Sequence, residues 1–172
     1  MPRIKGHLEP CKNGYHLCRE KDLLFWLGPT IWEAECRGGR VDDTNKIVVR
    51  QARLVRKVAT WNDRTARLFA CDCAEWALSL LADPDPRSIE AVRVARLFAI
   101  GEATGKELSA AWSAAESAAR SAAWSAAWSA ARSAARSAAW SAAESAAESA
   151  AESAAYSWMT ERLMQYLRGE AG

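Results

Sequence analysis

The chain has 172 residues, enough for one domain or two small ones, and its formal net charge of +2 argues against a general polyanion-binding protein. No run of residues approaches the roughly 20 apolar positions that a membrane-spanning helix needs. The N-terminal residues lack the apolar core of a signal peptide. The chain has five cysteines, which is an odd number. We therefore expect reduced thiols and a cytoplasmic location.

Residues 1–60 are predicted to form a small α+β head. GYHLC (14–18) alternates as a strand does, and REKDLLFWL (19–27) is typical of a short helix that ends at Gly28-Pro29. IWEAECR (31–37) alternates in the manner of a half-buried strand, and Gly38-Gly39 with the polar residues after it predicts a turn. KIVVRQARLVRKV (46–58) is β-branched and basic, and it predicts one long strand or two joined by a bulge.

Residues 61–103 are predicted to form a helical hairpin. DPDPRS (83–88) separates its two helices, with Asp85 as the N-cap of the second and Pro86 at its first position. Gly101 can end that helix in a left-handed conformation. Each helix has an apolar stripe, and the two stripes are Phe69, Cys73, Trp76 and Leu80, and Ile89, Val92, Ala95 and Ala99.

Residues 104–172 are dominated by a four-residue repeat. Thr104 to Glu107 fits a reciprocal capping box, and twelve consecutive x-Ser-Ala-Ala tetrads follow from Leu108 to Ala155. Alanine is the best helix former, and neither Gly nor Pro occurs between Gly105 and Gly169. The sequence therefore predicts one very long α-helix from about 105 to 168, on the order of 95 Å in length, with a C-terminal cap.

A strict period of four sets how such a helix packs. Four residues advance by roughly 400°, so each row of side chains drifts by about 40° per tetrad in the right-handed sense. Rows of small Ser and Ala residues allow close approach of two helices that cross at about 50°. We expect a right-handed, close-packed seam along these rows. The first residue of each tetrad forms a further row, the x row, whose Trp and charged residues flank the seam. The predicted interface residues are Trp112, Trp124, Trp128, Arg132, Arg136, Trp140, Glu144 and Glu148, with Ala126, Ala130, Ala134 and Ala138 in the seam.

The order of charges in the x row suggests how two copies would pair. A parallel partner would place Arg against Arg, whereas an antiparallel partner centred on Trp140 places Arg136 against Glu144 and Arg132 against Glu148. An antiparallel homodimer is therefore one hypothesis. A helix packed along its own N-terminal head is an equal alternative, and a repeat folded back as an Ala-packed hairpin is a third.

The chain offers little for catalysis or metal binding. The candidate metal ligands Cys11, His16, Cys18 and Cys36 lack the spacing of a tight Cys-x2-Cys knuckle, and we expect buried thiols and a strand histidine instead. His16 and Cys18 share a strand face, but no carboxylate is placed to orient the histidine. Phosphate-loop, GxGxxG and HExxH motifs are absent from the sequence. We expect neither enzymatic activity nor a cofactor.

The region 37–67 is basic and gives an alternative function. Nine Lys or Arg residues stand there against three Asp, with Trp61 nearby, and the alternative is therefore a nucleic-acid-associated protein that uses this region. Basic residues on a strand are more often solvated or paired with acids across the sheet. The basic residues are Arg37, Arg40, Lys46, Arg50, Arg53, Arg56, Lys57, Arg64 and Arg67.

Most of the chain resembles a group of bacterial and phage immunity proteins of the Imm5-like type. The resemblance is carried by GYHLCREKDLLFWLGPTIWEAECRG (14–38), KIVVRQARLVRKVATWNDRTARLFACDCAEWAL (46–78), DPRSIEAVRVARLFAIGEAT (85–104) and an Ala-rich helix with an ERLMQYL-like cap (161–167). It implies binding and neutralisation of a cognate toxin, without catalytic residues. We therefore expect a non-enzymatic protein that self-associates through the repeat, and the resemblance implies an immunity protein as its specific form.

Overall fold

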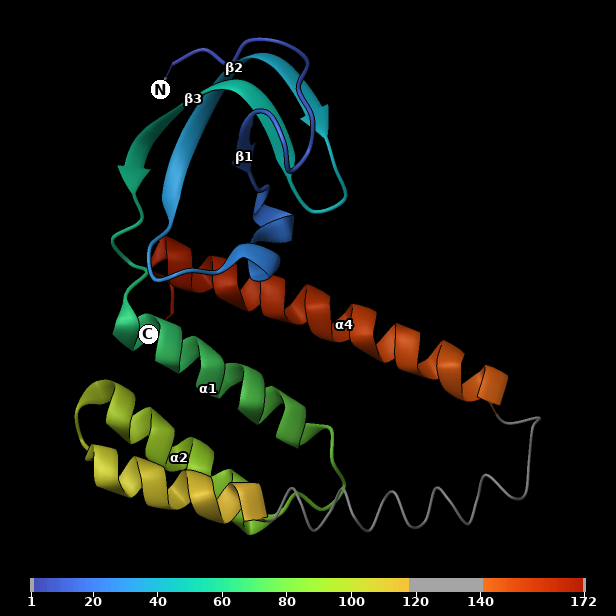
Figure 1. Ribbon diagram of the computed structural model, residues 1–172. Coiled ribbons are helices and arrows are strands. Elements are labelled where there is room, and N and C mark those ends of the chain that lie inside the picture. Colours follow the sequence, from blue (N-terminus) through green and yellow to red (C-terminus); the bar gives the residue numbers. More distant parts are fainter. Residues whose placement is uncertain (1, 118–140, 172) are drawn as a thin grey trace. The chain divides into compact units, whose positions relative to one another are not determined.

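The computed structural model describes residues 2–117 and 141–171, and these fall into two compact units (Figure 1). The sheet unit contains Met1–Asp63 and Met159–Gly172. The described residues of the helical unit are 64–117 and 141–158. Within the described residues, no helix is both long enough and apolar enough to cross a membrane.

The sheet unit is built on three antiparallel strands in the order β1-β3-β2. These strands are β1 (Tyr15–Leu17), β2 (Trp32–Asp42) and β3 (Ile47–Lys57), and the 3-10 helix η1 (Glu20–Trp26) follows β1. All three strands and the short helix were expected from the sequence. The sheet core consists of Ile47, Val49 and Ala52 of β3, with Tyr15 and Leu17 of β1 packed against them.

Two expectations about β2 are wrong. The strand does not end at Gly38-Gly39 but continues to Asp42, because the chain forms a bulge between Arg37 and Arg40 in which Gly38 has a φ of 81°. The reversal comes later, where the Asp43 N–H donates to the Lys46 carbonyl at 3.0 Å. The strand is also not half-buried, since its alternating residues are mostly exposed on both faces.

The helical unit begins with the predicted hairpin of α1 (Asp63–Ser79) and α2 (Pro86–Ile100). The signals at its ends are confirmed, because the Asp85 carboxylate accepts from the Arg87 N–H at 2.8 Å and Gly101 is left-handed with a φ of 85°. The apolar stripes are confirmed only in part. Phe69 and Ala99 are buried, whereas Leu80 and Ile89 are exposed.

The repeat region also begins as expected. The Thr104 N–H donates to Glu107 Oε2 at 2.7 Å, and the Glu107 N–H donates to Thr104 Oγ1 at 3.3 Å, which is the reciprocal capping box. A helix covers residues 105–117, and α4 (Ser141–Arg168) forms the end of the repeat and the C-terminal cap. Residues 118–140 lie outside the described residues.

The prediction of one very long helix over 105–168 is wrong. In such a helix Trp112 and Trp158 would lie roughly 69 Å apart at 1.5 Å per residue. Instead, Trp158 stacks on Trp76 of α1 with ring centroids 5.2 Å apart, and Trp112 lines a groove with the next α1 residues, Ala77 and Leu78. The described residues thus show mixed α and β structure with separate helices, of which the longest is the 28-residue α4.

The physical reason lies in packing rather than in helix propensity. A free helix of Ala and Ser buries almost no apolar surface, and most helix stability in proteins comes from tertiary contacts. Both described ends of the repeat region have such contacts. Leu108 and Trp112 lie against α1 and α2, and the last turns of α4 bury Leu163 and Tyr166 completely in the sheet unit.

Candidate interaction surface

The helical unit contains an apolar groove of about 560 Å³ between α1, α2 and helix 105–117. Small residues four positions apart leave this space open, because alanine side chains do not reach across to the next helix. They are Ala70 and Ala74 on α1 and Ala91 and Ala95 on α2. These pairs are visible in the sequence as i, i+4 alanines, but nothing in the sequence indicates that they face one another.

Helix 105–117 presents the repeat to this groove. Leu108 and Trp112 from the x row and Ala115 from an Ala row line it. Trp112 keeps 68 % of its surface exposed, although it stands beside an apolar wall. An exposed Trp next to a small-residue groove leaves apolar surface that a further packed helix would remove from water.

Polar contacts hold the hairpin that carries the groove. Arg96 of α2 donates to Asp72 of α1 at 2.6 Å and to Glu75 at 2.8 Å, and Asp72 is buried. Burial lowers the pKa of Arg96, but its bonds to these two carboxylates outweigh burial and raise that pKa. At the groove itself, the Arg67 guanidinium lies 5.1 Å from the centroid of the Phe98 ring.

The cysteine thiol that lines the groove is not activated. Cys71 lines it, and burial raises the pKa of this thiol, so the thiol is protonated near neutral pH. On the same helix, burial raises the pKa of Cys73 to about 11. This chemistry suits packing and recognition.

Most of the predicted interface lies outside the described residues. Trp124, Trp128, Arg132, Arg136 and Trp140 lie outside the described residues, as do the four seam alanines Ala126, Ala130, Ala134 and Ala138. Glu144 and Glu148 lie on α4, but their side chains are not described. Trp112 is the predicted interface residue whose surroundings the structure shows.

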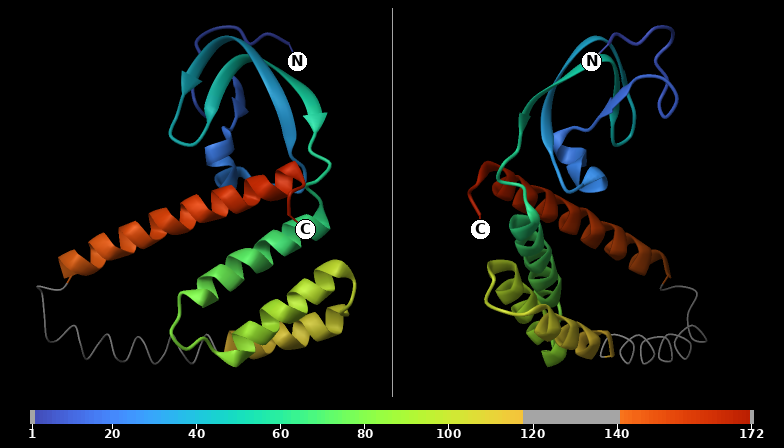
Figure 2. Two further views of the ribbon diagram at one scale, coloured as in Figure 1. Left: turned by 180° about the vertical axis from the view of Figure 1, so that it is seen from behind. Right: turned by 60° about the vertical axis from the view of Figure 1, so that its left-hand side comes forward.

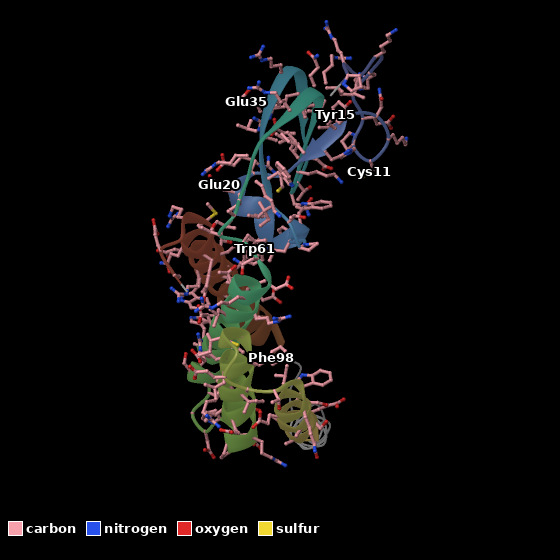
Figure 3. The ribbon with its side chains drawn as sticks, turned by 90° about the vertical axis from the view of Figure 1, so that its left-hand side faces the viewer. Cys11, Tyr15, Glu20, Glu35, Trp61 and Phe98 are labelled. Atoms are coloured by element: carbon pink, nitrogen blue, oxygen red, sulfur yellow. The ribbon has the colours of Figure 1, made fainter. Side chains whose placement is uncertain are left out.

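The candidate metal ligands lie in the sheet unit. The Cys11 N–H donates to His16 Nε2 at 2.8 Å, and Lys46 Nζ donates to the Cys11 sulfur at 2.9 Å, so His16 already has a partner in the chain. Figure 3 shows Cys11 in the loop before β1, near Tyr15. Burial raises the pKa of Cys18. In residues 2–117 and 141–171, no three His, Cys, Asp or Glu side chains are placed to hold a metal ion.

Several of the basic side chains in region 37–67 pair with nearby acids. Arg53 bonds Glu35 at 2.8 Å, and Arg56 pairs with Glu33 across the same two strands. Arg40 contacts Asp42, while Lys46 lies 3.6 Å from Asp43. Each such carboxylate competes with a nucleic-acid phosphate for the same cation, so this pattern weakens the nucleic-acid alternative.

No family model matches the chain, and neither a curated protein nor a solved structure is similar to it. The resemblance to immunity proteins therefore stays a prediction.

Proposed function

We propose that this chain is a non-enzymatic protein–protein interaction protein that self-associates through its x-Ser-Ala-Ala region. One observation carries the proposal: the start of the repeat folds as a helix that lines an alanine-walled groove and leaves Trp112 exposed beside it. The Ser and Ala rows of the repeat match the small residues of this groove in size. The groove thus shows at the start of the repeat the small-residue packing that we propose for two copies further along it.

The charges of the x row give the pairing its direction. Two arginines, Arg132 and Arg136, precede Trp140, and Glu144 and Glu148 follow it. An antiparallel pair of copies brings the arginines of one copy to the glutamates of the other, whereas a parallel pair opposes like charges. Neutralisation of a toxin is the specific form of interaction that the immunity-like resemblance suggests, and we place the protein in a cytoplasm because of its odd number of cysteines.

Charge reversal tests this pairing. Light scattering on the full chain should give the mass of a dimer. Reversing Arg132 and Arg136 to Glu should lower the mass toward that of a monomer, because four acidic residues of one copy then meet four of the other. Reversing Glu144 and Glu148 to Arg as well should restore the dimer, since opposite charges face each other again.

Arg3→Glu together with Lys5→Glu provides the matched control. These two exposed residues lie in the N-terminal segment, so their reversal changes the net charge equally without touching the repeat. A monomeric wild-type chain would contradict self-association. A dimer that is unaffected by reversing Arg132 and Arg136, or one that the combined reversal does not restore, would contradict the antiparallel arrangement.

A further inference from the structure

The sheet unit contains a cavity of about 950 Å³ that the function proposed above does not use. Its walls come from η1, the start of β2, the end of β3 with the segment after it, and the last turns of α4. The α4 wall is fixed, because Thr60 Oγ1 donates to the Leu167 carbonyl at 2.6 Å and Leu163 and Tyr166 are fully buried. The volume lies in the range of small-molecule pockets, roughly 300–1,000 Å³.

Much of the lining is apolar. Trp32 contributes an indole ring that remains 47 % exposed although it stands in a concave wall. An apolar ligand would remove this surface from water at roughly 25 cal/mol per Å². The cavity therefore suits an aliphatic or aromatic body. The other apolar lining residues are Leu23, Ile31, Val58, Met164 and Leu167.

The three arginines in the lining are already matched by acids. Arg19 pairs with Asp22 and Asp42, Arg56 pairs with Glu33, and Arg168 bonds Glu170 at 2.8 Å. Figure 3 shows Glu20 on η1, and this carboxylate adds to the field at Arg168.

Lys57 differs from these residues. Across the described ranges 2–117 and 141–171, no acidic side chain forms an ion pair with it. Its ammonium group is thus a cation of the cavity lining that no described acid pairs with, and it favours a ligand with a negative group.

The strand register places this cation beside the indole. Trp32 of β2 lies directly opposite Lys57 of β3. Directly opposite residues of an antiparallel pair project from the same face with Cβ atoms about 5 Å apart. One wall of the cavity therefore offers an aromatic surface next to a free ammonium group.

We propose that this cavity binds a small amphipathic anion, a hydrophobic carboxylate whose carboxylate lies at Lys57 and whose apolar body lies along Trp32, Met164 and Leu167. This site is independent of the repeat and of self-association.

Calorimetric titration of the full chain tests the site with two probes that share one alkyl chain and differ in charge. Decanoate should bind with one molecule per chain, and decyltrimethylammonium should bind at least about ten-fold more weakly because its charge repels Lys57. Both probes are used below their micelle concentrations. Absence of decanoate binding, or equal affinity for the two probes, would overturn the proposal.

Two substitutions locate the binding. Lys57→Gln removes the charge from an exposed side chain and should weaken decanoate binding up to about five-fold, the size of one solvent-exposed charge pair. Lys5→Gln is the matched control, an exposed lysine of the same unit outside the lining, and should leave the affinity unchanged. Equal affinities of these two variants would overturn the assignment of Lys57. Ala34→Phe places a ring in the cavity wall and should block both probes.

Discussion

The two ends of β3 lie in different surroundings. At its start, Val48 is wholly buried and lies between His16 of β1 and Val41 of β2. At its end, the residues from Arg53 to Lys57 pair with β2 alone and are exposed. We call the first part the covered end and the second the ribbon. A two-stranded ribbon is marginally stable by itself, so the covered end should carry most of the stability of the sheet unit.

The N-terminal segment makes part of this difference. Ile4 donates its N–H to the Arg50 carbonyl at 2.9 Å, and Arg50 returns two bonds to the carbonyls of Ile4 and Gly6, each at 2.9 Å. Leu8 of the same segment is buried. Figure 2 shows the segment beside the strands from two further sides. The ribbon has cross-strand ion pairs instead. At its far end, Lys57 and the opposite residue Trp32 line the cavity.

The largest predicted effect comes from crowding the covered end. Gly14 has a φ of 137°, and a Cβ added there would meet Cγ1 of the fully buried Val48. Gly14→Ala should lower the free energy of unfolding by about 3 kcal/mol, because backbone strain and overpacking add. Urea unfolding followed through the amide signals of β3 measures this loss.

Gly28→Ala is the control for that experiment. A Cβ at Gly28 meets nothing within 4 Å, so the change should stay within about 0.5 kcal/mol. Adding Val48→Ala to the Gly14→Ala chain removes the atom that clashes and should therefore cost less than the sum of the two single losses. Equal effects of the two glycine substitutions would show that the covered end is looser than described.

Substitution of one arginine in each part of β3 compares the stability that the two parts contribute. Arg50→Met removes two charge-assisted bonds to the N-terminal segment and should cost about 1.5 kcal/mol. Arg53→Met removes only an exposed ion pair with Glu35 and should change stability by at most about 0.5 kcal/mol. Hydrogen exchange of the Ile4 amide should accelerate in the first variant and not in the second. The reverse order of effects would contradict the role given to the N-terminal segment.

The sequence predicted best those local features that depend only on residues adjacent in the chain. The Asp85 cap, the left-handed Gly101 and the Thr104–Glu107 box were all predicted, because each needs only a few adjacent residues. Gly38-Gly39 was misread as a turn because the bulge is set by pairing with β3, many residues away. Local signals could not show this pairing.

The sequence failed to predict the packing of the repeat and the presence of the cavity for the same reason. Alanine propensity and an absence of Gly and Pro predict helix, but they do not say where that helix packs, so one long helix was expected where separate helices occur. The cavity depends on α4 meeting the segment after β3 through Thr60 and Leu167. No spacing in the sequence relates these two residues. The i, i+4 alanines of α1 and α2 were a usable signal for the groove, although the sequence does not show that they meet.

The smallest predicted effect is a pH response confined to the ribbon. A hydrogen bond from Arg56, followed by the charge of that guanidinium, holds the pKa of Glu33 below its ordinary value of 4.5. A carboxyl whose pKa is lower in the folded state stabilises the fold above its ordinary pKa, and this contribution is lost as pH falls through the lowered pKa. Below pH 4.5, ribbon amides should therefore lose exchange protection, after correction for intrinsic rates, while the amides of Ile47 to Val49 keep theirs.

A side-chain carboxyl titration by NMR gives the matching readout. In the wild-type chain Glu33 should titrate below 4.5, and in Arg56→Gln it should return to that value because the guanidinium is gone. An unchanged Glu33 titration in the variant would mean that the cross-strand pair does not form in solution. Loss of protection at both ends of β3 together would show that covered end and ribbon unfold as one unit, which contradicts the contrast drawn between them.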